Sequence, residues 1–182
     1  MGNLTMLTKL NLSYNDLQGN IPREIFHITS ALTECILSYN NLHGTIPTEV
    51  GNLKQLVSLH LSSNKLSGEV PGALGECQEL QIIQMDQNIL TGSIPQSLSN
   101  LKSLVVLNIS HNSLSGTIPT PLSDMQYLEQ LDLSYNQLHG EIPQNGVFDI
   151  WVTLALQTSC VTQTQHQLDI PVQPQLQIAQ SD

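Results

Sequence analysis

Basic and aromatic side chains are scarce in this sequence. Lysine and arginine together number 5 among 182 residues, against 15 aspartate and glutamate residues, and aromatic residues make up only 4%. Nucleic-acid binding requires basic patches for the phosphates, and adsorption to an anionic membrane requires clustered cations. The net charge of −10 therefore argues against both kinds of partner.

Long apolar runs are also missing. The best candidate, Val147 to Leu156, is about half of the ~20 residues that a membrane-spanning helix needs, and it contains Asp149. The first residues, "MGNLTMLTKL", lack the basic region followed by an apolar region that marks a signal peptide. We therefore expect no direct membrane insertion by this chain.

Catalytic motifs are not visible either. A catalytic site needs a nucleophile, a base and charge-stabilising groups that converge. The kinase signatures are absent from the sequence: there is no Gly-rich phosphate loop, no His-Arg-Asp and no Asp-Phe-Gly. We expect neither an enzyme nor a cofactor in this chain.

The sequence does contain a strong internal repeat. One frame recurs six times, as in "LTKLNLSYNDLQGNIP" and "LVVLNISHNSLSGTIP", with a spacing of 25 residues once and 24 thereafter. Its register is marked by one asparagine per unit: Asn15, Asn40, Asn64, Asn88, Asn112 and Asn136. Internal periodicity of this length indicates a solenoid, in which stacked units share one continuous core.

The frame has a direct physical interpretation. In Leu-x-x-Leu-x-Leu-x-x-Asn-x-Leu, the Leu-x-Leu part alternates with period two and predicts a short strand with its leucines inward. The Asn lies where the chain leaves the strand, and we expect its amide to bond backbone groups of its own coil and of the next one. The following Gly permits a strained turn, and Ile-Pro fixes φ for the return path.

These motifs closely resemble the plant-specific leucine-rich repeat, in which "LSGxIP" follows the Asn. The segments "EVGNLKQLVSLHLSSNKLSGEVP" and "SLSNLKSLVVLNISHNSLSGTIP" are near that consensus. The resemblance implies an α/β-type solenoid, a horseshoe with short parallel strands on a concave face and 3-10 or irregular structure on the convex side. The block "GEIPQNGVF" further resembles the end of the repeat array in plant receptor-like kinases that detect microbial patterns.

The two ends depart from that family. Met1 falls where Val50 stands in "VGNLKQL", so the array opens inside a repeat, and we interpret the chain as part of a longer parent. We predict a repeat array over residues 1–143 and a non-repeat tail over 144–182. The tail holds eight Gln in its last 32 residues, a composition that suits disorder. The resemblance implies a parent at the plasma membrane, with extracellular repeats and a serine/threonine kinase outside this chain.

The outward positions of the strands are the candidate binding site. Three columns of side chains vary while the frame is held, and from them we predict a ligand-binding face made of Tyr14, Glu34, Ile36, Tyr39, His60, Ile82, Gln84, Val106, His111, Gln130, Asp132 and Tyr135. Ile82 and Val106 should lie about 5 Å apart on neighbouring strands, and tyrosine is enriched at binding hot spots. The alternative is an ordinary solvated face.

The histidines and cysteines do not indicate a metal or thiol site, whereas three asparagines lie in glycosylation sequons. His43 and His139 occupy equivalent positions four repeats apart, so about 19 Å separates them and no single metal ion joins them. Cys35 and Cys77 take leucine positions and should be buried. Three sequons, at Asn3, Asn11 and Asn108, would accept glycans in a secreted protein, or else they simply follow from the repeat frame.

The sequence leaves three functions open. The first is a fragment of a receptor-kinase ectodomain that recognises a peptide or protein ligand and a co-receptor. The second is a soluble repeat protein similar to the plant inhibitors of pectinases. The third is a truncated gene product without a function of its own.

Overall fold

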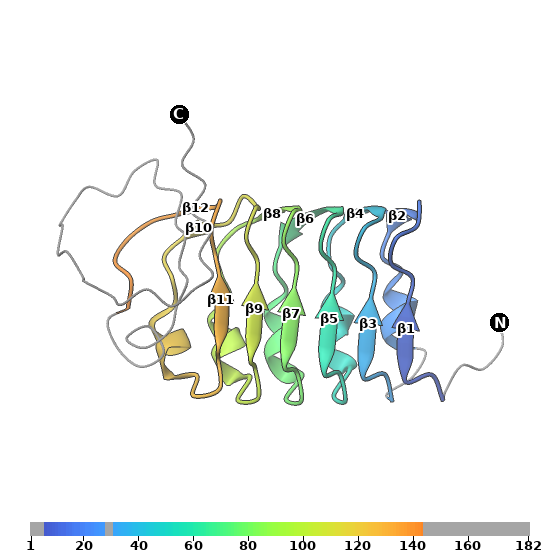
Figure 1. The fold of residues 1–182 in the computed structure, drawn as a ribbon, viewed down its shortest axis with the longest axis horizontal. Helices are drawn as coiled ribbons and strands as arrows, with labels where there is room; N and C mark the ends of the chain where they lie inside the picture. The colour runs from blue at the N-terminus through green and yellow to red at the C-terminus, as the bar shows by residue number, and fades with distance from the viewer. Residues whose placement is uncertain (1–5, 28–30, 144–182) are drawn as a thin grey trace, which may run out of the picture.

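The computed structural model describes residues 6–27 and 31–143; the predicted tail from residue 144 lies outside these residues. A row of six parallel strands forms the front of the molecule in Figure 1, in the order β1-β3-β5-β7-β9-β11. Their bounds are Lys9–Asn11, Glu34–Ile36, Ser58–His60, Ile82–Gln84, Val106–Asn108 and Gln130–Asp132. The predicted solenoid with one strand per repeat is confirmed.

Register follows the repeat. The central residue of each strand pairs with that of the next, from Leu10 with Cys35 to Leu107 with Leu131. These central side chains point inward, and from Cys35 onward they are buried. Because successive residues of a strand point to opposite faces, the two flanking residues of every strand face outward.

A second set of strands, which the sequence did not predict, runs along the side of the solenoid. It comprises β2 (Gln18–Asn20), β4 (Asn41–Gly44), β6 (Lys65–Glu69) and β8 (Ile89–Thr91), followed by the separate pair β10 (Ser115–Gly116) and β12 (Gln137–Leu138). Each begins just after a repeated Asn or a few residues beyond it. The glycine of each repeat has a positive φ, 74° at Gly68 for example, which a residue with a side chain rarely adopts.

The side of the solenoid opposite the six-stranded sheet carries 3-10 helices, which lie behind these strands in Figure 1. They are η1 (Arg23–His27), η2 (Thr48–Asn52), η3 (Gly72–Glu76), η4 (Gln96–Asn100) and η5 (Thr120–Asp124). The proline of the Ile-Pro or Val-Pro pair precedes η2 to η5 directly, with φ between −61° and −65°. Its fixed φ starts the helical turn, as the repeat frame predicts.

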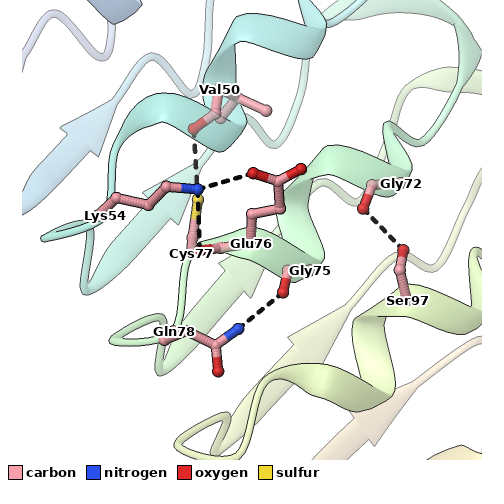
Figure 2. Close-up of polar contacts among 8 residues, drawn as sticks. All are labelled: Val50, Lys54, Gly72, Gly75, Glu76, Cys77, Gln78 and Ser97. Carbon is pink, nitrogen blue, oxygen red and sulfur yellow. Dashed lines mark hydrogen bonds and ion pairs between the residues drawn. The ribbon is translucent and has the colours of Figure 1, made fainter.

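Short contacts join neighbouring coils on this helical side (Figure 2). The Ser97 hydroxyl donates to the Gly72 carbonyl at 2.7 Å, and the Cys77 thiol donates to the Val50 carbonyl at 3.3 Å. Lys54 Nζ lies 2.8 Å from Glu76 Oε2, and this ion pair lowers the pKa of the Glu76 carboxyl. The helices thus pack coil against coil with little room between them.

The core runs the length of the array, but its first coil is open. Leu37 and Leu42 of the second coil are 2% and 5% exposed, whereas their counterparts Leu12 and Leu17 in the first coil are 38% and 39% exposed. A repeat buries its apolar face only against a neighbour on each side. Within the described ranges, no helix has the length and apolarity that crossing a membrane requires.

Candidate functional site

The outward side of the six-stranded sheet, called here the strand face, is the candidate site. The first column of outward residues consists of Lys9, Glu34, Ser58, Ile82, Val106 and Gln130; the second consists of Asn11, Ile36, His60, Gln84, Asn108 and Asp132. Members of one column are register partners on adjacent strands. The predicted residues from both columns are therefore brought together on one surface.

The repeated asparagines hold the turn beside this face. Asn88 Nδ2 donates to the carbonyls of Leu61, Met85 and Asp86 at 3.0–3.2 Å, and its Oδ1 accepts the Leu66 N–H at 2.9 Å. The same set of bonds, to the asparagine's own coil and to the preceding one, is made by Asn40, Asn64, Asn112 and Asn136.

The direction of these bonds corrects one expectation. The asparagine joins its own coil to the preceding coil, not to the next one: Asn88 accepts the Leu66 N–H and donates a second hydrogen bond to the Leu61 carbonyl, which Asn64 already serves. The side chain of Asn15, with no described coil before it, bonds only the carbonyls of Leu12 and Ser13 in its own coil. The ladder thus begins at the second repeat of the described chain.

The third column lies at the turn and has an unusual backbone. All six members have φ between 50° and 57°: Tyr14, Tyr39, Ser63, Gln87, His111 and Tyr135. This left-handed conformation is uncommon for residues other than glycine and asparagine. It occurs once per coil, directly before the repeated Asn, so the geometry belongs to the fold and positions these side chains at the edge of the strand face.

Two pairs in the third column stack their rings. Tyr14 and Tyr39 have ring centroids 4.3 Å apart, and His111 and Tyr135 have centroids 4.0 Å apart, both nearly parallel. Partial desolvation, with the neighbouring Tyr39 hydroxyl, raises the pKa of Tyr14. Stacked rings present a broad, rigid edge, which suits contact with a partner at low cost in side-chain entropy.

The strand face carries a half-buried aliphatic stripe, made of Val57, Ile82, Val105 and Val106. Ile82 is the register partner of Val106. The Val57 carbonyl accepts the N–H of Ile82 at 3.1 Å, which places Val57 beside it. The sequence predicted Ile82 and Val106 but missed Val57 and Val105, which precede their strands. Their signal was a valine where the other repeats have Thr, Gln or Glu.

Some polar side chains of the strand face bond to a side chain on the next coil. His60 Nδ1 lies 2.7 Å from Gln84 Oε1, and Lys9 Nζ lies 2.9 Å from Glu34 Oε2. Ile36 stands next to His60 in the second column, away from the aliphatic stripe. The N-terminal coils therefore present a neutralised ion pair and two tyrosines, while the central coils present aliphatic carbon.

Two sequons lie on the strand face in the same local structure. Asn108 Oδ1 accepts the Ser110 N–H at 3.1 Å and its hydroxyl at 2.8 Å, and Asn11 binds Ser13 in the same way. Asp132 makes these bonds to Ser134 without being a sequon. The second column thus favours Asn or Asp for the turn itself. Asn3 lies outside the described residues.

Metal and thiol chemistry find no support in the described ranges. No group of three or more His, Cys, Asp or Glu side chains there could hold a metal ion, and His43 and His139 are exposed on separate coils. Cys35 and Cys77 are fully buried. Burial raises the pKa of Cys35 to about 12 and that of Cys77 to about 11, so both stay protonated at neutral pH.

Comparison with known proteins gives a consistent result. The profile of the leucine rich repeat family matches residues 5–66 and 78–138. A comparison of the sequence with curated proteins gives no significant match.

Three solved structures illustrate the range of similar folds. The plant peptide hormone receptor RGFR1, solved in complex with RGF2, is 40% identical with a TM-score of 0.79, over 84% of this chain and 24% of that one. The BIR3–SERK2 complex from Arabidopsis thaliana is 38% identical with a TM-score of 0.65, over 72% and 69%. A plant ice-binding protein is 34% identical with a TM-score of 0.73, over 76% and 44%. The chain spans less than a quarter of the RGFR1 chain.

Proposed function

Because the chain belongs to the leucine-rich repeat family, whose profile covers most of it, we propose that its strand face binds an extended peptide and that it is part of a plant receptor-kinase ectodomain. The chain is a repeat scaffold similar to plant receptor ectodomains. The same fold also serves a plant ice-binding protein, so the fold alone does not decide function. The proposal rests on the face itself.

The observation that carries the proposal is the aliphatic stripe. Ile82 and Val106 are register partners on neighbouring strands, and Val57 and Val105 stand just before β5 and β9; all four side chains are half-buried, and no described segment covers them. A contiguous exposed apolar patch on a soluble surface favours a binding site, whereas scattered apolar residues do not. An extended peptide laid across the strands would cover this stripe.

The receptor assignment draws on the neighbours and on one segment. One neighbour is a peptide hormone receptor bound to RGF2, and another is a complex that contains SERK2. The segment "GEIPQNGVF" favours a receptor over a soluble inhibitor of pectinases. In this proposal the parent presents the repeats outside the plasma membrane, a co-receptor joins the bound peptide, and a serine/threonine kinase lies elsewhere in the parent.

Selection from a random 12-residue peptide library displayed on phage tests the proposal. The full chain from bacterial expression, which adds no glycans, is the bait. A double variant, Ile82→Gln with Val106→Gln, makes the stripe polar at half-buried positions where the fold tolerates it. Ile89→Gln is the matched control, because Ile89 is 56% exposed on β8, away from the strand face.

Selected peptides should bind the wild type and Ile89→Gln equally and lose binding to the double variant. Far-UV circular dichroism must show that both variants fold. Selected peptides that bind all three proteins alike would contradict a site on the strand face.

A further inference from the structure

The strand face also has an uneven distribution of charge. The described residues contain five cations, Lys9, Arg23, Lys54, Lys65 and Lys102, and only Lys9 lies on the strand face. Lys9 is already paired with Glu34 at the N-terminal end. Arg23 and Lys54 pair with acids on the helical side, and Lys102 donates to the Ser99 carbonyl there.

Among Lys, Arg, Asp and Glu, the C-terminal half of the strand face carries only acidic side chains. Asp86, Glu129 and Asp132 face no cation among the described residues. Asp86 accepts a hydrogen bond from the Ser62 hydroxyl, and Asp132 uses one oxygen to accept two bonds from Ser134. The second oxygen of Asp132 has no partner in the described part of the chain, so it remains able to accept from a ligand.

Glu129 and Asp132 flank the end of the aliphatic stripe. Gln130, the first-column residue of β11, is the register partner of Val106. Glu129 precedes Gln130, and its N–H donates to the Val105 carbonyl at 2.9 Å. Asp132 follows two residues later and faces the same side as Gln130. A cation placed over Gln130 would therefore have the Asp132 carboxylate beside it on the same face, and the exposed Glu129 stands one residue before Gln130.

The spacing of the strands sets the spacing of the ligand. Adjacent strands lie about 4.8 Å apart, so the seam between Ile82 and Val106 lies one and a half strands, about 7 Å, from Gln130. In an extended peptide, side chains two residues apart point the same way and lie about 6.8 Å apart. If one side chain of the ligand lies over the seam, the side chain two residues further along the ligand therefore lies over Gln130.

From these observations we propose that the strand face selects an extended cationic peptide in which an aliphatic residue and a Lys or Arg stand two positions apart. This inference rests on the proposed peptide-binding function and specifies the class of ligand. The aliphatic side chain covers the seam between Ile82 and Val106. The ammonium or guanidinium group lies between Glu129 and Asp132 and takes up the oxygen of Asp132 that the turn does not use.

The charges of Glu129 and Asp132 can be removed by substitutions that keep the local fold. Asn108 caps its turn as Asp132 does, so Asp132→Asn should keep the bonds to Ser134. Gln81 stands at the position of Glu129 in an earlier coil, so Glu129→Gln also has a precedent in the repeat. The matched control is Glu49→Gln with Glu79→Gln, which changes the net charge equally and leaves the strand face intact.

The same peptide selection gives the test. Selected sequences should be enriched in an aliphatic residue and a Lys or Arg at positions i and i+2, in either order, and depleted in Asp and Glu. Affinity for Glu129→Gln/Asp132→Asn should fall on the order of tenfold, because partly desolvated charges lose their partners. Affinity for the Glu49→Gln/Glu79→Gln control should stay within about twofold of wild type, and added salt should weaken the wild-type complex.

The outcomes separate the two proposals. Peptides that depend on Ile82 and Val106 but show no basic enrichment, or bind the neutralised variant unchanged, would overturn this inference and leave the peptide site standing. If no selected peptide depends on Ile82 and Val106, the peptide site fails, and the charge rule fails with it.

Discussion

Replacing one buried asparagine of the ladder should destabilise the whole array. Asn88 is 7% exposed, and its amide makes four hydrogen bonds to backbone groups of two coils. In Asn88→Ala, the Leu66 N–H loses its acceptor in a place that water does not reach. The three carbonyls that Asn88 serves each keep one other donor, for example the amide of Asn112 on the Met85 carbonyl.

The expected cost follows from this inventory. One orphaned buried donor costs about 1–3 kcal/mol, and the three weakened carbonyls add to it, so we expect about 2–4 kcal/mol in total. Asn15→Ala is the matched control, because the Asn15 side chain is exposed and bonds only two carbonyls of its own coil. Water can replace those bonds, so its cost should stay within about 0.5 kcal/mol.

Asn88→Asp adds a test of the chemistry. The carboxylate can still accept the Leu66 N–H, but it turns an oxygen toward three carbonyl oxygens. Burial and this repulsion raise the folded-state pKa of the new Asp above its unfolded value. The destabilisation should therefore be largest at neutral pH and should shrink as the pH falls through the folded-state pKa.

Urea unfolding followed by far-UV circular dichroism measures these differences, with one slope fitted to wild type and variants. Equal losses in the free energy of unfolding for Asn88→Ala and Asn15→Ala would contradict the buried ladder. So would a loss in Asn88→Asp, relative to wild type at the same pH, that grows as the pH falls.

Three further predictions concern packing and burial. Gly75→Ala should lower the free energy of unfolding by about 1–3 kcal/mol, because the new Cβ would clash with the Ser97 carbonyl of the next coil, whereas Gly72→Ala, with its nearest contact at 3.3 Å from the Ser97 hydroxyl, should cost less. Leu42→Ala should cost about 2–5 kcal/mol in urea unfolding, and Leu17→Ala at the open end clearly less; equal costs would mean that the first coil is covered. Brief iodoacetamide labelling at pH 8, located by peptide mass spectrometry, should leave Cys35 unmodified in the folded chain and modify it in urea, because a pKa of about 12 leaves about one thiolate in 10⁴.

The strand of each repeat and its turn could be predicted from the sequence because the same local geometry is required in every coil. The spacing of the asparagines fixes the register, so Ile82 and Val106 had to meet. A proline before each of η2 to η5 and the one positive-φ glycine of each repeat follow from backbone restrictions that a short motif states directly.

Other features depend on what neighbouring coils offer and were not predictable from one motif. The side strands β2, β4, β6 and β8 form because successive turns come into register, which the loop residues alone do not reveal. The direction of the ladder depends on which coil leaves backbone groups unpaired. Only Ile82 and Val106 of the stripe were predicted. Val57 and Val105 precede their strands, where the alternation of strand side chains does not say which face a residue joins.

A crystal structure of the full chain with the tightest selected peptide would show whether the strand face is the binding site. We expect an extended peptide across β5 to β11, with an aliphatic side chain over Ile82 and Val106 and a basic side chain beside Asp132. A peptide seated on the helical side, on the side strands or at the open first coil would contradict it.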